Sequence, residues 1–121
     1  MIENTVGGRV VVGLDGSVGS RAALDWACAE ALRLARGLTI VHSWHLPVTV
    51  GPYVNPSPET FEEGARHVVN EAADRARAAL PPGWDVRAKT WMGRPADFLV
   101  AESEDAAVVV VGSRGRGGIQ G

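Results

Sequence analysis

The sequence predicts an α/β domain, a parallel β-sheet with helices on both of its faces. Short runs rich in β-branched residues alternate along the chain with longer segments whose apolar residues recur every three or four positions. Glycine or proline stands at most of the boundaries between them. The length of 121 residues fits a single domain, 1–121, and leaves no room for a second one.

The first strand and the first helix are predicted by a change in the spacing of apolar residues along the chain. Residues 9–14 (RVVVGL) form a β-branched run bounded by glycines, which is typical of a buried strand. Residues 20–35 follow the spacing of a helix with one buried face. Its apolar positions are Ala23, Leu24, Ala27, Cys28, Ala31, Leu32 and Ala35. Ser17 or Ser20 can cap the first turn, and Gly37 stands where a C-cap glycine is expected.

The second strand is predicted at residues 38–44 (LTIVHSW), and a proline-rich loop follows at 45–58. A second helix comes next, and the run Pro81-Pro82-Gly83 stops it. The predicted buried face of this helix consists of Phe61, Ala65, Val68, Ala72, Ala76 and Ala79.

The remaining elements are an edge strand, a short helix and a very apolar strand. Residues 85–91 alternate between two faces, as expected for a strand with one wet face. One face of this strand carries Val86, Ala88 and Thr90, and the solvent-exposed face carries Arg87, Lys89 and Trp91. Gly93-Arg94-Pro95 opens a third helix with proline at its favoured first position. Residues 107–112 (AVVVVG) are the most apolar strand.

The resulting order βαβαβαβ predicts a Rossmann-like parallel sheet with helical crossovers. Ligands of such sheets bind at the carboxyl ends of the strands, where the strand order reverses. Two segments follow strands at that edge: Asp15-Gly16-Ser17 and the glycine-rich run 112–118 (GSRGRGG).

The glycine-rich run can hold phosphate, because backbone amides approach an anion closely where side chains are missing. Arg114 and Arg116 add charge that can reach phosphate oxygens. A solvated turn is the alternative. The run is no Walker loop, since no Gly-Lys-Ser/Thr follows, and it stands in the wrong place for a dinucleotide fingerprint.

Asp15 has two interpretations that do not exclude each other. Its carboxylate can accept hydrogen bonds from a ribose or a base, or lie near a phosphate-bound metal. It can also belong to an Asp-Gly turn that caps the first helix.

We expect neither catalytic residues nor a metal site. His42 stands alone in its strand, and no serine or cysteine has a recognisable catalytic partner. Cys28 lies on the buried face of a helix, where we expect inert packing. A single cysteine also excludes an internal disulfide, and no zinc-ligand spacing exists.

Charge and hydropathy argue against nucleic acid and membranes as partners. The net charge of -2 gives no electrostatic reason for nucleic-acid binding. No window reaches the roughly 20 apolar residues of a membrane span, and the start MIENTVGGRVVVG does not look like a signal peptide. We therefore expect a cytoplasmic location.

Together, VVVGLDGS, TIVHSW, GRPADFLV and VVVVGSRGRGG resemble the universal stress protein family, nearest to its actinobacterial tandem-type members. The resemblance implies a five-stranded parallel sheet in the order 3-2-1-4-5. In the ATP-binding branch, adenosine lies over the ends of the first, second and fourth strands. The cofactor implied is ATP, with or without Mg²⁺, and the partner is a second copy or a tandem domain.

The same resemblance implies the site residues. Gly13 and Asp15 would flank adenine and ribose, and Ser43 would meet the base through its backbone. The residues implied to line the ribose and phosphates are Val111, Gly112, Arg114 and Gly115.

The chain departs from the family in its phosphate motif, which reads Gly, two residues, Gly, nine residues, Gly, then Ser or Thr. Gly112 and Gly115 fit the first half, and the third glycine would fall beyond Gly121. We therefore expect the final helix and the fifth strand to be absent from this chain. Either the protein is truncated there or its tail lies beyond the given residues.

The predicted function is a non-catalytic ATP sensor or carrier in a stress response. A nucleotide-independent interaction module of the same family is the alternative, favoured by the missing half of the motif. A slow ATPase is a third hypothesis, with no residue placed to activate water.

Overall fold

The computed structural model describes residues 8–15, 19–44 and 58–111 of the chain. Within these residues, four parallel strands form one sheet in the order β3-β2-β1-β4. The elements are β1 (Arg9–Leu14), α1 (Gly19–Leu34), β2 (Leu38–Trp44), α2 (Pro58–Ala79), β3 (Val86–Met92), α3 (Pro95–Ser103) and β4 (Ala106–Val111). The predicted α/β class and the strand order through the fourth strand are confirmed. The expectation about a fifth strand concerns residues outside these ranges and stays a prediction.

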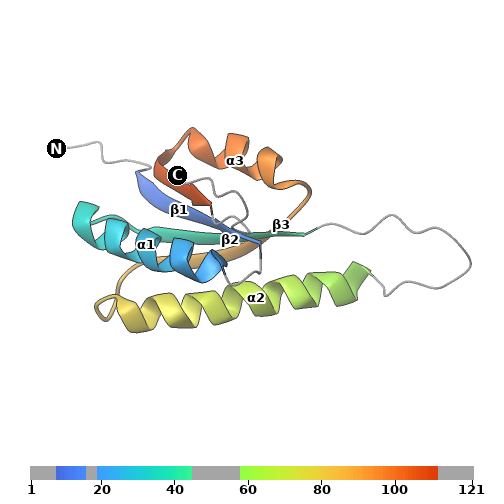
Figure 1. The fold of residues 1–121 in the computed structure, drawn as a ribbon, viewed down its shortest axis with the longest axis horizontal. Coiled ribbons are helices and arrows are strands. Elements are labelled where there is room, and N and C mark those ends of the chain that lie inside the picture. Colours follow the sequence, from blue (N-terminus) through green and yellow to red (C-terminus); the bar gives the residue numbers. More distant parts are fainter. Residues whose placement is uncertain (1–7, 16–18, 45–57, 112–121) are drawn as a thin grey trace, which may run out of the picture.

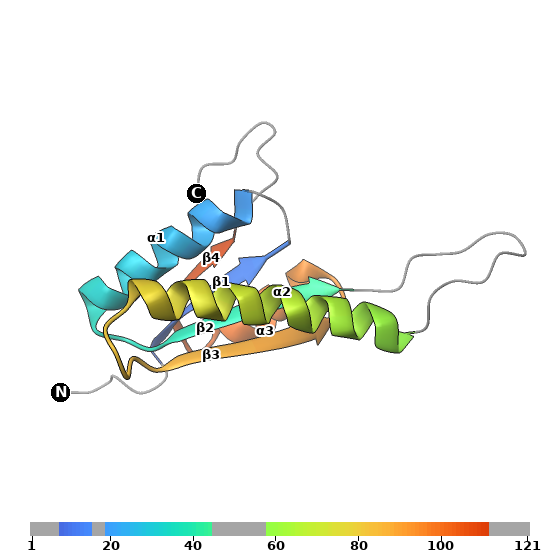
Figure 2. The same cartoon turned by 90° about the horizontal axis from the view of Figure 1, so that it is seen from below.

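The helices form two layers around the sheet. Helices α1 and α2 cover one face and α3 covers the other (Figure 1). From the α1 and α2 side, the two helices lie next to each other in front of the strands (Figure 2). Right-handed crossovers explain this arrangement. The connections from β1 to β2 and from β2 to β3 move across the sheet in one direction, whereas the connection from β3 to β4 moves in the opposite direction. The returning crossover therefore places α3 on the opposite face.

Strand β1 is central, and its residues are buried in alternation on both faces. Val10, Val12 and Leu14 belong to the core under α1 and α2. Val11 belongs to a smaller core under α3 together with Val41. A sheet covered on both faces needs apolar residues at successive positions, which is why β1 is a continuous apolar run. Full burial of each such valine stabilises the fold by about 1.5 to 3 kcal/mol.

The buried face of α2 differs from the predicted one. Val69, 1% exposed, takes the place expected for Val68, which is half-buried, and Ala79 is exposed. The buried residues of α2 are Ala65, Val69, Ala72, Ala73 and Ala76. Alanine has no bulk beyond Cβ, so adjacent positions such as Ala72 and Ala73 both fit against the sheet.

Helix α1 ends differently from the prediction as well. Ala35 has a φ of 57°, in the left-handed region. Its N–H donates to the Leu32 carbonyl (3.2 Å), and that of Arg36 donates to the Ala31 carbonyl (2.9 Å). This is a Schellman motif with alanine at the position that usually holds glycine. The expectation that Gly37 is the C-cap is therefore wrong.

Strand β3 is shifted by one residue relative to the prediction and lies at an edge of the described sheet, as expected. Its Trp91 was expected on a wet face. In the structure this side chain is half-buried and packs on Phe98 of α3, with ring centroids 6.3 Å apart. The prediction failed because α3 covers that end of the strand.

Candidate functional site

Four of the residues predicted to bind nucleotide lie at one edge of the sheet. Gly13 pairs with Val41 of β2 and with Val111 of β4. Asp15 follows the end of β1, and Ser43 is near the end of β2. Strands β2 and β3 lie on one side of β1, and β4 lies on its other side. The strand order therefore reverses between β1 and β4.

The other three predicted residues, Gly112, Arg114 and Gly115, lie outside the described residues. Their roles stay predictions.

Asp15 is tied to the first turn of α1. Its Oδ1 accepts a 2.7 Å hydrogen bond from Oγ of Ser20, and its N–H donates to the same Oγ at 3.1 Å. Ser20 is buried, whereas Asp15 is exposed. Ser20 therefore anchors Asp15 from inside α1 rather than capping the helix. Asp15 thus lies exposed at the carboxyl end of β1, held there by α1.

His42 fixes the end of β1 from the neighbouring strand. Its Nδ1 lies 2.9 Å from the carbonyl oxygen of Leu14, which is also its partner in the strand register. A carbonyl only accepts, so Nδ1 carries the proton. In the neutral imidazole, Nε2 is then an acceptor. The structural role expected for His42 matches this bond.

Gly13 is a glycine at a point of close packing. A Cβ built on it would overlap Cζ of Phe98, at 3.2 Å from Cε1 of that ring and 3.3 Å from Cγ1 of Val111. Phe98 is buried, with 1% of its surface exposed. The absence of a side chain at Gly13 therefore makes room for a ring of α3.

The end of β2 is held by the turn before α3. Ser43 pairs with Trp91, and the carbonyl of Trp44 accepts a 2.8 Å hydrogen bond from the N–H of Gly93. Gly93 has a φ of 143°, which side chains rarely tolerate. The strand end that carries Ser43 is thus fixed to α3 as well as to its neighbours in the sheet.

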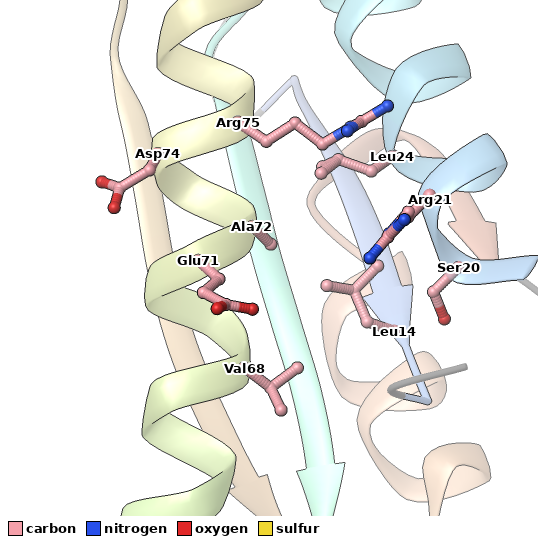
Figure 3. A pocket seen from close by; sticks show the side chains of 9 residues that line it. All are labelled: Leu14, Ser20, Arg21, Leu24, Val68, Glu71, Ala72, Asp74 and Arg75. Atoms are coloured by element: carbon pink, nitrogen blue, oxygen red, sulfur yellow. The ribbon is translucent and has the colours of Figure 1, made fainter. Parts of the chain in front are cut away.

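A cleft of about 440 Å³ opens between α1 and α2, next to Ser20 (Figure 3). Its lining residues are Leu14, Ser20, Arg21, Leu24, Val68, Glu71, Ala72, Asp74 and Arg75. Arg21 reaches from α1 into the gap, and Glu71 faces it from α2 (Figure 3). This cleft could not be predicted from the sequence, because the spacing of apolar residues along two helices does not determine the distance between the helices.

An ion pair links the two helices near this cleft. Arg75 donates to both carboxylate oxygens of Asp25, each at 3.0 Å. The Arg75 guanidinium lowers the pKa of Asp25 below its ordinary value through these hydrogen bonds. Cys28 lies one turn further along α1 and is 4% exposed. Its burial, together with the nearby Asp25 carboxylate, raises the pKa of the thiol, in agreement with the inert packing that we expected.

Among residues 8–15, 19–44 and 58–111, no three His, Cys, Asp or Glu side chains gather as a metal site would require. Of the described helices, none is both long and apolar enough to cross a bilayer.

Comparison with known proteins agrees with the motifs. Universal stress protein Rv2005c of Mycobacterium tuberculosis is 36% identical over 118 residues, which are 91% of this chain and 39% of that protein. The chain thus spans well under half of that relative. A universal stress family protein from Burkholderia pseudomallei has a similar structure, with a TM-score of 0.72 and 25% identity, covering 92% of this chain and 85% of that one.

A second solved structure is a universal stress protein in complex with cAMP. It matches with a TM-score of 0.64 and 25% identity, covering 86% of this chain and 75% of that one. The sequence model of the universal stress protein family matches residues 8–121, almost the whole sequence. This chain therefore belongs to the universal stress protein family.

Proposed function

We propose that this chain is a non-catalytic adenine-nucleotide-binding domain, in which ATP, with or without Mg²⁺, lies over the carboxyl ends of β1, β2 and β4. Nucleotide occupancy would change the association of the domain with protein partners in a stress response, as in a sensor or a carrier. The observation that carries the proposal is the meeting of Gly13, Asp15, Ser43 and Val111 where the strand order reverses.

The groups at this edge suit a nucleoside. The exposed Asp15 carboxylate can accept hydrogen bonds from ribose hydroxyls or from the amino group of adenine. Ser43 offers its backbone to the base, and Val111, 52% exposed, offers an apolar surface. The glycine-rich residues after β4 would take the phosphates through their amides.

The family supports the choice of an adenine nucleotide. A related structure holds cAMP, which shares the adenine and the ribose with ATP. Our proposal extends that chemistry to this chain and prefers ATP, because Gly112 and Gly115 match the first half of the phosphate motif.

One described side chain supports binding without turnover. The thiol of Cys28 is buried with a raised pKa, so it is not placed as an activated nucleophile. We further propose a cytoplasmic location and a second copy or a tandem domain as partner. The greater length of Rv2005c supports the tandem arrangement.

Mass spectrometry on purified, acid-denatured protein, combined with a phosphate-release assay, tests this function. We expect an adenine nucleotide to co-purify and added ATP to remain unhydrolysed over hours. Steady phosphate release would favour the slow ATPase. A protein that carries no nucleotide and takes up none from an ATP solution would favour the interaction module.

The phosphate half of the proposed site has its own test. Gly115→Val would keep the backbone amides away from the phosphates, because a β-branched side chain blocks close approach. ATP affinity should fall strongly while adenosine affinity stays near that of the parent. Equal ATP affinity in the two proteins would place the phosphates elsewhere.

A further inference from the structure

Phe98 is the largest of the completely buried side chains among the described residues. It comes from α3 and packs with Val11 of β1 and Val41 of β2. Trp91 of β3 borders its ring at a tilt of 53°. The ring is thus held between one helix and three strands.

The tip of this ring reaches the proposed nucleotide site. Cζ and Cε1 of Phe98 fill the space that Gly13 leaves, and Val111 borders the same space with Cγ1. Gly13 and Val111 are paired across β1 and β4, at the point where the strand order reverses. One side chain of α3 therefore fills the space over Gly13 that Val111 also borders, at the strand ends between which we place the nucleotide.

Helix α3 is itself fixed at both ends. Before its first turn, the N–H of Gly93 donates to the Trp44 carbonyl at 2.8 Å. In its last turn, Glu102 forms a 2.6 Å ion pair with Lys89 of β3. Because both ends are tied to β2 and β3, α3 can hold the Phe98 ring at a defined place over β1 and β4.

We propose that Phe98 is the positioning residue of the nucleotide site: its ring, seated over Gly13, holds the end of β1 in place beside Val111 and thereby sets the surface on which the nucleotide lies. This inference rests on the proposed function. It gives Gly13 a different role from the one that the family resemblance implies, since the residue is glycine to admit the ring rather than to touch the ligand. A side chain that served only the core would change stability and leave the affinity of the folded protein unaltered.

Gly13→Ala and Phe98→Leu, alone and combined, test this with Mg²⁺-ATP as the probe in calorimetry. The new Cβ displaces the ring, so Gly13→Ala alone should weaken ATP binding by about tenfold. Leucine lacks the Cε and Cζ atoms that the new Cβ would meet. In the Phe98→Leu background, Gly13→Ala should therefore change affinity by less than about threefold. The same tenfold loss in both backgrounds would mean that Gly13 touches the nucleotide directly, and would overturn the inference.

Val69→Ala is the control for a purely structural effect. Val69 is as deeply buried as Phe98 but packs on the other face of the sheet, in the core under α1 and α2. It should lower the Tm and leave the ATP affinity of the folded protein unchanged, whereas Phe98→Leu should weaken binding by about threefold or more. If the two variants leave affinity equally intact, Phe98 is only a core residue and the inference fails. If the parent chain binds no ATP, both the proposed function and this inference fail. If the parent binds ATP and the effects of Gly13→Ala and Phe98→Leu on affinity are additive, only this inference fails.

Discussion

Ser20 and Asp15 bind each other twice at the junction of β1 and α1. The hydroxyl of Ser20 donates to the Asp15 carboxylate at 2.7 Å and accepts from the Asp15 N–H at 3.1 Å. The two residues therefore share one structural role, but only Asp15 is exposed at the proposed nucleotide site. This difference allows the structural and the binding roles of Asp15 to be separated.

Asp15→Ala removes only the carboxylate bond and should lower stability by about 1 kcal/mol, whereas Ser20→Ala removes both hydrogen bonds and should lower stability by more. Asp15→Ala should also weaken ATP binding by more than about tenfold, since a charge-assisted ligand contact is lost. Ser20→Ala leaves the carboxylate in place and should keep most of the affinity. Denaturant unfolding and calorimetry on both variants measure the two effects. Equal loss of affinity in both would show that Asp15 acts only by holding the loop.

Ala35→Gly should stabilise the protein by about 0.5 to 1 kcal/mol. A left-handed conformation costs an alanine about 1 to 2 kcal/mol, and the greater freedom of glycine in the unfolded chain offsets part of the gain. Ala29→Gly is the matched control, because it makes the same change at an exposed position inside α1 and should cost about 1 kcal/mol. The free energies of urea unfolding measure both changes. If Ala35→Gly and Ala29→Gly change this free energy in the same direction, the Schellman geometry at Ala35 is contradicted.

Cys28 should react slowly with an aromatic disulfide reagent in the native protein. The thiol is 4% exposed and its pKa is raised, so little thiolate is present or accessible. Labelling followed by absorbance should accelerate steeply when urea unfolds the chain. Native labelling as fast as that of the unfolded chain would show that α1 opens freely.

The ion pair between Arg9 and Asp85 should make stability fall in acid. Arg9 donates a 2.6 Å hydrogen bond that lowers the pKa of Asp85 below its ordinary value of 3.8. Because the folded-state pKa is the lower one, this contribution is present above pH 3.8 and is lost as the pH falls through the folded value. The carboxylate is largely exposed, so the effect is about 0.2 to 1 kcal/mol.

Asp85→Asn should therefore lower the Tm at neutral pH and lose this effect at strongly acidic pH. Asp105→Asn, at another exposed carboxylate, is the control. Thermal unfolding of both variants across this range gives the comparison. A deficit of Asp85→Asn that persists unchanged in strong acid would mean that the charge on Asp85 is not its cause.

The strands could be predicted from the sequence because a buried parallel sheet requires continuous apolar runs. The predicted bounds of β1 and β2 match the structure, and those of β3 and β4 are shifted by one residue. The strand order came only with the family resemblance, since several orders satisfy the same alternation of elements.

Contacts between distant residues could not be predicted. The segment GRPADFLV shows that Phe98 is apolar, but not that its ring fills the space above Gly13. Ala35 adopts a conformation that local rules assign to glycine, in a turn closed by the hydrogen bonds from Ala35 to Leu32 and from Arg36 to Ala31. Likewise, the cleft between α1 and α2 depends on how two helices pack, which neither helix specifies alone.

In the proposed function, the carboxyl ends of β1, β2 and β4 recognise adenine nucleotides. Calorimetric titration of the protein with Mg²⁺-ATP, matched by a titration with Mg²⁺-GTP, tests it most directly because the two ligands differ only in the base. We predict saturable binding of one ATP per chain and clearly weaker binding of GTP, because in the proposed site the Ser43 backbone meets the adenine. No saturable binding of ATP, or equal affinity for the two nucleotides, would contradict the proposed function.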